Sequence, residues 1–277
     1  MNLFHPLAMK SRLVLLWSFV FLVLGQAYVF AQFTYSTSGL LHSPSGEMQK
    51  DGTVMIVSNF LNRNNLPNDS YWGYNTFSYG INITFWKRLE IAYVCTLLKG
   101  KDDGSGWPES TWGKWANQDR HFSARFLLLD EGEFWTHMPS VVIGIHDPTT
   151  GAPTKGTPGY GDYIHSDVGG SGNGFFNKMY IAATKHFSVP YGKIGLHAGY
   201  QYNRRTDYPL NAPCFAVDFV PSFFTDSFIV PRFICEYDSR TFNMGFITTL
   251  WNNHFDVMFE LQALKWFSWG FRYKVVL

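Results

Sequence analysis

The sequence predicts an all-β protein, a single antiparallel transmembrane β-barrel of about twelve strands. Three observations support this prediction: segments in which apolar and polar residues alternate, many aromatic but few charged side chains, and a regular succession of long and short connections. Of the 277 residues, 18% are aromatic and 16% are charged, whereas roughly 25% are charged in an ordinary soluble domain. The net charge of +1 provides no general electrostatic attraction to nucleic acid, so no nucleic-acid partner is expected.

The amino-terminal region has the features of an export signal. Lys10 and Arg12 precede an apolar run from Leu13 to Leu24, which is too short to cross a bilayer as a helix. Small residues then stand at the positions that a signal peptidase reads, in Val29-Phe30-Ala31. We therefore expect a cleaved signal peptide over residues 1–31 and export through the inner membrane; an uncleaved anchor is the alternative.

The chain after residue 31 is dominated by alternation with a period of two, which is typical of strands with one apolar and one polar face. From Thr76 to Phe85, for example, aromatic and branched apolar residues alternate with Ser, Gly, Asn and Thr. His254 to Ala263 and Phe267 to Leu277 repeat the pattern. The predicted strands cover residues 52–60, 74–86, 89–99, 119–129, 138–146, 176–187, 192–203, 214–220, 227–237, 241–251, 254–264 and 266–277.

The connections between these strands fall into two classes. Short ones alternate with long ones that are rich in Gly, Asn, Asp and Pro, and the longest is Asp147 to Phe175. Outer-membrane barrels have long loops outside the cell and short turns in the periplasm. The alternation therefore predicts the cell outer membrane as the location and membrane lipid as a partner. A secreted β-sandwich is the alternative. The short connections are Lys87-Arg88, Asp130 to His137, Ser188 to Tyr191, Pro221 to Asp226 and Asn252-Asn253.

Polar and charged residues of the predicted strands fall opposite the apolar face. On the lipid side, a charge costs about 2–4 kcal/mol near mid-membrane, so we expect these residues to face the barrel lumen. The two signs are balanced, which favours ion pairs and water over a field that selects one ion. The predicted lumen-facing residues are Glu90, Arg125, Lys193, His197, Asp218, Arg232, Glu236, Asp256, Glu260, Arg272 and Lys274.

Aromatic residues also occur in the long connections, among Gly, Asp and Asn. They are Trp107, Trp112, Trp115, Tyr160 and Tyr163. Aromatic faces next to polar side chains are suited to stacking on sugar rings while hydroxyls form hydrogen bonds. The alternative is that these aromatics form the outer interfacial belt of the barrel.

Several short motifs follow one another in chain order: Gly39-Leu40-Leu41-His42-Ser43-Pro44-Ser45-Gly46-Glu47-Met48 with Asp51-Gly52-Thr53, Phe126 to Gly132, Pro139 to His146, Tyr180 to Lys185, Glu236-Tyr237-Asp238-Ser239, and Phe242-Asn243-Met244-Gly245. Together they resemble the motifs of the YjbH-type exopolysaccharide proteins. The resemblance implies a non-catalytic outer-membrane barrel that serves extracellular polysaccharide production or export. It also implies polysaccharide and other export or assembly proteins as partners.

Residues 32–51 are expected to form an extended lead-in to the barrel, which occupies 32–277. A Pro-containing stretch at Pro44 and a turn at Asp51-Gly52 would lead into the first strand.

Two other functions stay open beside polysaccharide export: a general small-solute porin, and an outer-membrane hydrolase with its active site at the extracellular rim. No local nucleophile motif is present, so no catalytic residue is predicted. Cys95, Cys214 and Cys235 lack the spacing of a zinc or redox site, and we expect neither metal nor cofactor.

Overall fold

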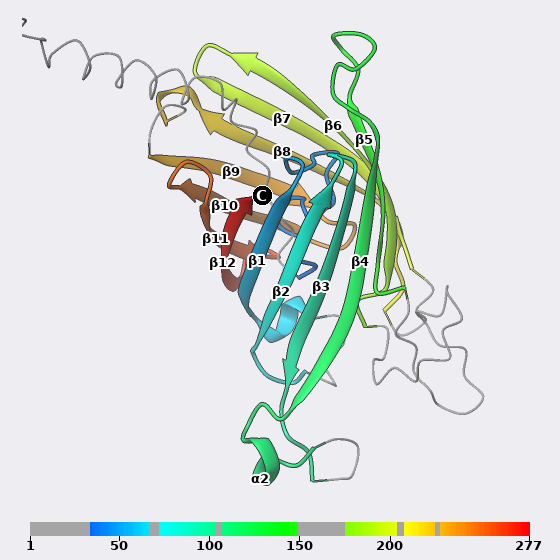
Figure 1. The fold of residues 1–277 in the computed structure, drawn as a ribbon, viewed down its shortest axis with the longest axis vertical. Helices are drawn as coiled ribbons and strands as arrows, with labels where there is room; N and C mark the ends of the chain where they lie inside the picture. Colours follow the sequence, from blue (N-terminus) through cyan, green and yellow to red (C-terminus); the bar gives the residue numbers. More distant parts are fainter. Residues whose placement is uncertain (1–33, 67–71, 103–106, 149–174, 204–207, 225–227) are drawn as a thin grey trace, which may run out of the picture.

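The chain forms a closed barrel of twelve antiparallel strands in the computed structural model (Figure 1). The structure describes residues 34–66, 72–102, 107–148, 175–203, 208–224 and 228–277. The strands are β1 (Thr53–Leu61), β2 (Thr76–Phe85), β3 (Leu89–Leu98), β4 (Asn117–Leu129), β5 (Ser140–His146), β6 (Lys178–Val189), β7 (Gly192–Tyr202), β8 (Asn211–Pro221), β9 (Ile229–Tyr237), β10 (Phe242–Leu250), β11 (Phe255–Gln262) and β12 (Trp266–Val276).

Each strand pairs with its neighbours in the sequence, and β1 pairs with β12 to close the ring. The closing register places Val54 opposite Val275 and Phe60 opposite Trp269. Closure leaves no strand edge with unpaired backbone groups, as a hydrocarbon environment requires. The predicted all-β barrel is thereby confirmed, and the strand ends differ from the predicted ones by a few residues.

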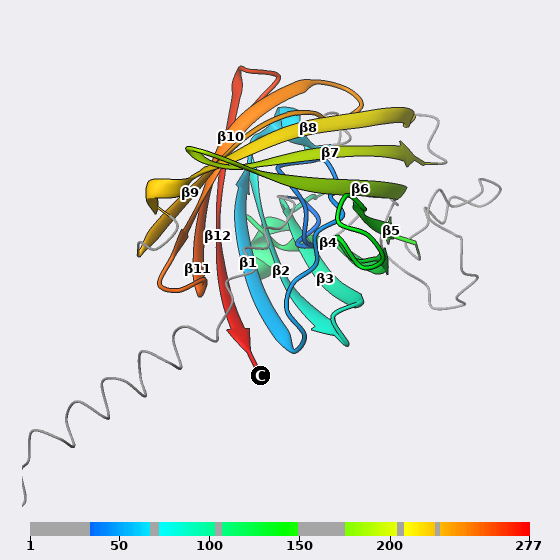
Figure 2. The same cartoon turned by 90° about the horizontal axis from the view of Figure 1, so that it is seen from above.

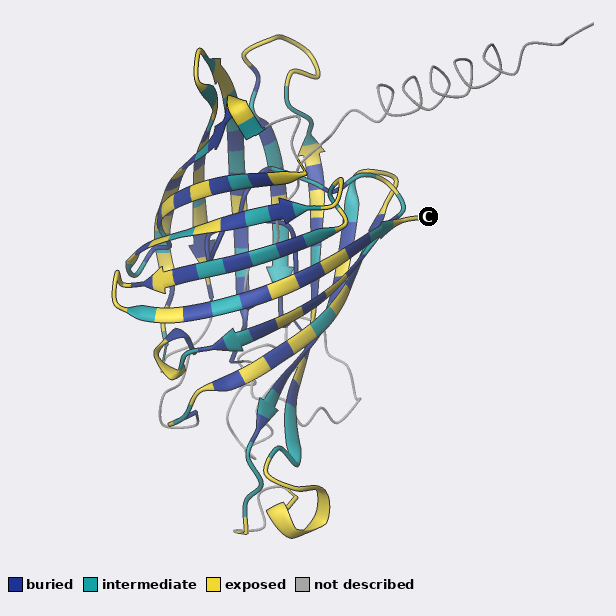
Figure 3. Ribbon diagram, turned by 90° about the vertical axis from the view of Figure 1, so that its left-hand side faces the viewer, coloured by how far each residue is buried: buried dark blue, intermediate teal, exposed yellow. Residues whose placement is uncertain are grey.

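Burial alternates along the strands, as the stripes of Figure 3 show. In β2, the side chains of Phe77, Tyr79 and Ile81 are exposed on the outside, while Ser78 and Asn82 are buried on the inside. Exposed aromatic and branched apolar side chains recur on this outer face in every part of the ring. Such a surface would be unstable in water but suits hydrocarbon, and the architecture is that of a transmembrane β-barrel.

The two ends of the barrel differ. At one end the strands are joined by short turns, and the turn after β2 has positive φ at Trp86 and Lys87. Two successive residues with positive φ match the twist of a tight hairpin. Exposed aromatics cluster at this end, where they suit a membrane–water interface: Trp86, Phe134, Trp135, Tyr191, Phe228 and Trp251.

The opposite end carries the long connections, among them the one that contains the short helix α2 (Glu109–Trp112), at the bottom of Figure 1. A single-turn 3-10 helix, η1 (Arg63–Asn65), follows β1 at this end, and another, η2 (Ser222–Phe224), follows β8 at the short-turn end. Two connections at the long-loop end are themselves short, residues 238–241 and 263–265. Among the described residues, no helix is long and apolar enough to cross a membrane.

The chain before β1 lies inside the barrel. Residues Thr34–Asp51, hereafter the inner segment, run within the ring of strands and appear in dark blue in Figure 2. All of its residues from Ser36 to Gly46 are buried. A turn ends the segment: the N–H of Thr53 donates to the carbonyl of Lys50, and Gly52 has φ +71°. The predicted turn at Asp51-Gly52 is present, but the lead-in is packed in the lumen.

Candidate functional site

The predicted lumen residues lie on the inward faces of their strands, where the alternation places them. One of them, Lys193, is nevertheless exposed, because it lies near the start of β7 at the short-turn end. The remaining ones are buried inside the ring: Glu90, Arg125, His197, Asp218, Arg232, Glu236, Asp256, Glu260, Arg272 and Lys274. A buried charge is costly unless other groups pair with it, so its partners decide what the lumen can do.

Glu236 on β9 holds the middle of the inner segment. Its carboxylate accepts hydrogen bonds from the backbone N–H groups of Leu41, His42 and Ser43, at 2.7 to 3.3 Å. The His42 side chain extends the attachment, because its Nε2 lies 2.5 Å from a carboxylate oxygen of Glu260 on β11. Hydrogen bonds to a charged acceptor are stronger than neutral ones. Two wall carboxylates thus fix the segment at residues 41–43.

Glu90 and Arg125 face each other across β3 and β4, yet each bonds to the inner segment. Glu90 accepts from the N–H and the hydroxyl of Ser38, at 2.5 and 2.6 Å. Arg125 donates to the carbonyls of Ser45 and Glu47, at 2.7 and 2.6 Å. These opposite charges on neighbouring strands therefore both bind the backbone of the inner segment.

A further charged network lies nearer the short-turn end. Arg232 bridges Asp218 on β8, at 2.7 Å, and Glu47 of the inner segment, at 3.0 Å. His197 Nε2 also lies 2.6 Å from Asp218. His186 Nε2 lies 3.2 Å from Glu47, which links the segment to β6 as well. Glu47 is therefore shared between two wall strands.

The β4–β5 turn continues this network to the surface. Glu131 lies 2.6 Å from His186 Nδ1 and 3.2 Å from the Lys185 ammonium. Partial burial raises the pKa of Glu131, but the hydrogen bonds from His186 and Lys185 outweigh this and hold that pKa below its usual value.

Not every inward charge binds the segment. Asp256 on β11 pairs with Lys274 on β12 at 2.9 Å and lies 3.8 Å from Arg272. It also accepts a hydrogen bond from Thr249 on β10. These side chains all belong to wall strands, and they link β10, β11 and β12 through ion pairs of the kind that the sequence predicts.

Apolar contacts anchor the inner segment beside its polar bonds. Leu40 and Leu41 pack with inward-facing Ile234, Ile247 and Met258 of β9 to β11. Met48 packs in a separate cluster that includes residues of β4, β5 and β6. The segment is therefore held inside the ring by side chains from many strands.

A hydroxyl–imidazole–carboxylate series occurs in the lumen. Thr184 Oγ1 lies 2.8 Å from His197 Nδ1, and His197 Nε2 lies 2.6 Å from Asp218. The N–H of Gly46 donates to the same Thr184 oxygen, and the Thr184 side chain is buried. The inner segment therefore contacts this hydroxyl directly. Among the described residues, no group of acidic, His or Cys side chains is placed to hold a metal ion.

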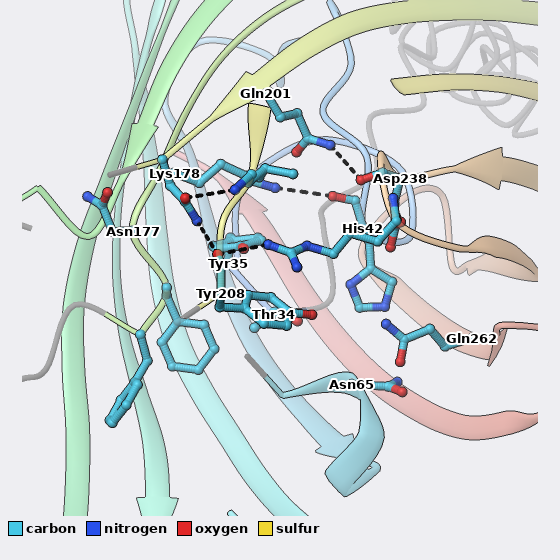
Figure 4. A pocket seen from close by; sticks show the side chains of 15 residues that line it. Thr34, Tyr35, His42, Asn65, Asn177, Lys178, Gln201, Tyr208, Asp238 and Gln262 are labelled. Atoms are coloured by element: carbon cyan, nitrogen blue, oxygen red, sulfur yellow. Dashed lines mark hydrogen bonds between the residues drawn. The ribbon is translucent and has the colours of Figure 1, made fainter. Parts of the chain in front are cut away.

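A pocket opens at the long-loop end, beside the first residues of the inner segment (Figure 4). It holds about 540 Å³ of space between protein atoms, part of it open to solvent. Tyr35 and His42 line it from the segment, and Lys178, Gln201 and Arg240 from the wall. The alternation already places Lys178 and Gln201 on inward faces, but it gives no sign that they converge.

Trp107, Trp112 and Trp115, the predicted loop aromatics that the structure describes, do not line this pocket. Trp107 and Trp112 are exposed around α2. Trp115 packs against Tyr74 and the outward-facing Phe77, with ring centroids 5.7 and 6.5 Å apart. Its place on the outer surface at the strand ends is that of an interfacial belt residue. Tyr160 and Tyr163 lie outside the described residues.

Comparison with known proteins gives similarity in architecture. The KdgM porin, solved in complex with disordered oligogalacturonate, is similar with a TM-score of 0.41 and 8% identity, over 80% of this chain and 98% of that one. An outer membrane channel from Pseudomonas putida F1 is similar with a TM-score of 0.41 and 11% identity, over 84% and 98%. No family model and no curated protein matches the chain. Likeness at this level carries no conclusion about this chain, whose barrel architecture is shown by its own strand pairing.

Proposed function

We propose that the protein is an outer-membrane channel whose passage is closed by its own inner segment. The observation that carries the proposal is the set of bonds around that segment. Side chains from strands on different sides of the ring bind it, including Glu90, Arg125 and Glu236. The ring is continuous outside the segment, since all twelve strands pair with both neighbours. Removing the segment would leave a polar passage inside an intact wall.

The chemistry of the inner wall favours a barrel that encloses a passage rather than a permanently filled core. A barrel that needs only stability gains little from buried carboxylates and guanidinium groups, because removing them from water is costly. Here Glu90, Arg125 and Glu236 are buried and bond directly to the inner segment. Water would solvate the same groups if the segment left, so the wall is compatible with a filled and an open lumen.

Conductance across a planar bilayer tests the proposal. The full chain is expected to be silent or to open briefly, and a chain lacking residues 34–50 is expected to conduct steadily. Trp107→Ala, an exposed loop change, serves as the control and should behave as the full chain does. Each protein is first shown to be folded by the shift of its gel mobility on heating. Steady conductance of the full chain, or silence of the folded deletion variant, would overturn the proposal.

A role in exopolysaccharide production or export is the second candidate, and one observation favours it. The motifs that resemble the YjbH-type proteins lie far apart in the chain but touch at the inner segment. Glu236 binds residues 41–43, Thr184 binds Gly46, and Met48 packs with Tyr180 and Ala182. The resemblance therefore coincides with the segment and its binding surface. Deleting the gene should alter capsule or matrix sugar in this case, and unchanged glycan would contradict it.

A further inference from the structure

The pocket at the long-loop end, hereafter the mouth pocket, contains a buried cation that no carboxylate contacts among the described residues. The Lys178 side chain at the start of β6 is only 4% exposed. Its ammonium lies 3.4 Å from the carbonyl of His42 and 4.1 Å from the centre of the Tyr35 ring. Within the described part of the chain, no carboxylate oxygen lies within ion-pair distance of it. A carbonyl and a ring face compensate a buried ammonium only in part.

Two acidic residues belong to this region, Asp238 in the pocket lining and Glu236 beside it, and both accept hydrogen bonds from other groups. Glu236 accepts three backbone N–H groups of the inner segment and the amide of Asn243. Asp238 accepts the N–H groups of Arg240 and Thr241 and the same amide. The Arg240 guanidinium lies over the Tyr208 ring at 3.3 Å and adds a second positive charge to the lining. The pocket therefore favours an anionic group next to Lys178.

Three residues that line the same pocket have buried carboxamide oxygens that lack donors in the described part of the chain. Gln201 donates from its amide nitrogen to the Asp238 carbonyl and to Ser239 Oγ, which fixes its orientation and leaves its Oε1 without a donor among the described residues. The side-chain oxygens of Asn65 and Gln262 are likewise buried and without a donor in this part of the chain. Buried acceptors are costly when unpaired, and hydroxyl groups of a ligand would satisfy them.

We infer that the mouth pocket binds a small polyhydroxylated carboxylate. Its carboxylate lies against the Lys178 ammonium, and its hydroxyls donate to the carboxamide oxygens of Gln201, Gln262 and Asn65. An anion without hydroxyls leaves the carboxamides unpaired, and a neutral polyol leaves the ammonium without a counter-charge. Because Tyr35 and His42 complete the lining, the ligand also contacts the inner segment.

Calorimetric titration of the folded, detergent-solubilised full chain tests the inference with three probes. Gluconate carries both chemistries, sorbitol has the hydroxyls without the carboxylate, and acetate has the carboxylate without the hydroxyls. Gluconate is expected to bind at least tenfold more tightly than either of the others. Equal binding of the three probes, or no binding of gluconate, would overturn the inference.

Variants locate the site. Lys178→Met should weaken gluconate binding at least tenfold, and Gln201→Leu should weaken it less while leaving acetate unaffected. Lys185→Met is the matched control, because Lys185 lies on the same strand at the other end, bonded to the carbonyl of Thr136. Heat-modifiable gel mobility shows that each variant is folded. Unchanged gluconate binding by both pocket variants would overturn the assignment. The titration measures no conductance, so its outcome is separate from that of the channel proposal.

Discussion

The barrel wall and the inner segment are both buried, but different interactions hold them. Each wall strand bonds through its backbone to two neighbours, for example β6 to β7 in an unbroken register from Met179 to Val189. The inner segment bonds mainly through its backbone to wall side chains, as Leu41 to Ser43 do to Glu236. A strand cannot leave without opening the barrel, whereas the segment can exchange its bonds for water one carboxylate at a time. The inner segment and the wall strands are therefore equally buried, but the segment can be released more easily than a strand.

The largest expected effect distinguishes the inner segment from the barrel wall by two substitutions in the same apolar cluster. Leu41 of the segment and Ile247 of β10 are both fully buried and belong to the same apolar cluster. Truncating a buried Leu or Ile to Ala costs about 2–5 kcal/mol where the side chain is part of the cooperative fold. Ile247→Ala should lower the free energy of unfolding of the barrel by that amount, measured by urea titration in lipid vesicles. Leu41→Ala should leave it nearly unchanged and instead make the segment accessible to protease. Equal loss of barrel stability in both variants would show that segment and wall form one unit.

A charge on the outer face tests the membrane environment of the wall. Ile81→Arg places a guanidinium on the outer face near the middle of β2 and should destabilise the barrel by about 2–4 kcal/mol. Tyr191→Arg is the matched control, because Tyr191 is 80% exposed in the β6–β7 turn, where the cost falls to about 0–1 kcal/mol. The same urea titration measures both. A similar small cost at the two positions would mean that Ile81 does not face hydrocarbon.

The smallest effect concerns pH at the point where the segment network reaches the surface. The folded state holds the pKa of Glu131 below its unfolded value, so its contribution to stability is present above the unfolded pKa. That contribution is lost as the pH falls through the folded pKa. Glu131→Gln should therefore reduce the difference in stability between neutral and acidic solution, measured by unfolding titrations at a series of pH values. An unchanged pH dependence would contradict the role of the His186 and Lys185 contacts.

The strands were predictable because alternation is local. Each strand such as β2 or β11 shows its two faces in its own sequence, and the lumen positions of Asp256 and Glu260 follow directly. Lys193 lies on the predicted inward face but is exposed, because alternation gives the face of a side chain and not its distance from the end of the barrel.

The position of the inner segment inside the barrel could not be predicted from alternation. Its residues show no period, and its partners lie far away: Glu236 is 194 residues from His42, and Glu90 is 52 residues from Ser38. The chain around Gly39 to Pro44 carries no pattern that distinguishes a lead-in from a lumen filling. The mouth pocket was missed for the same reason, since Lys178 and Gln201 converge only through the closure of the ring.

Hydrogen exchange of the inner segment, followed by mass spectrometry, tests the central claim most directly. In the full chain, the amides of residues 41–43 should exchange slowly. In Glu236→Gln they should exchange at least tenfold faster, which corresponds to about 1.4 kcal/mol, while the amides of β6 and β7 keep their protection. Rapid exchange of the segment in the unaltered chain, or simultaneous loss of protection in segment and strands, would contradict the account.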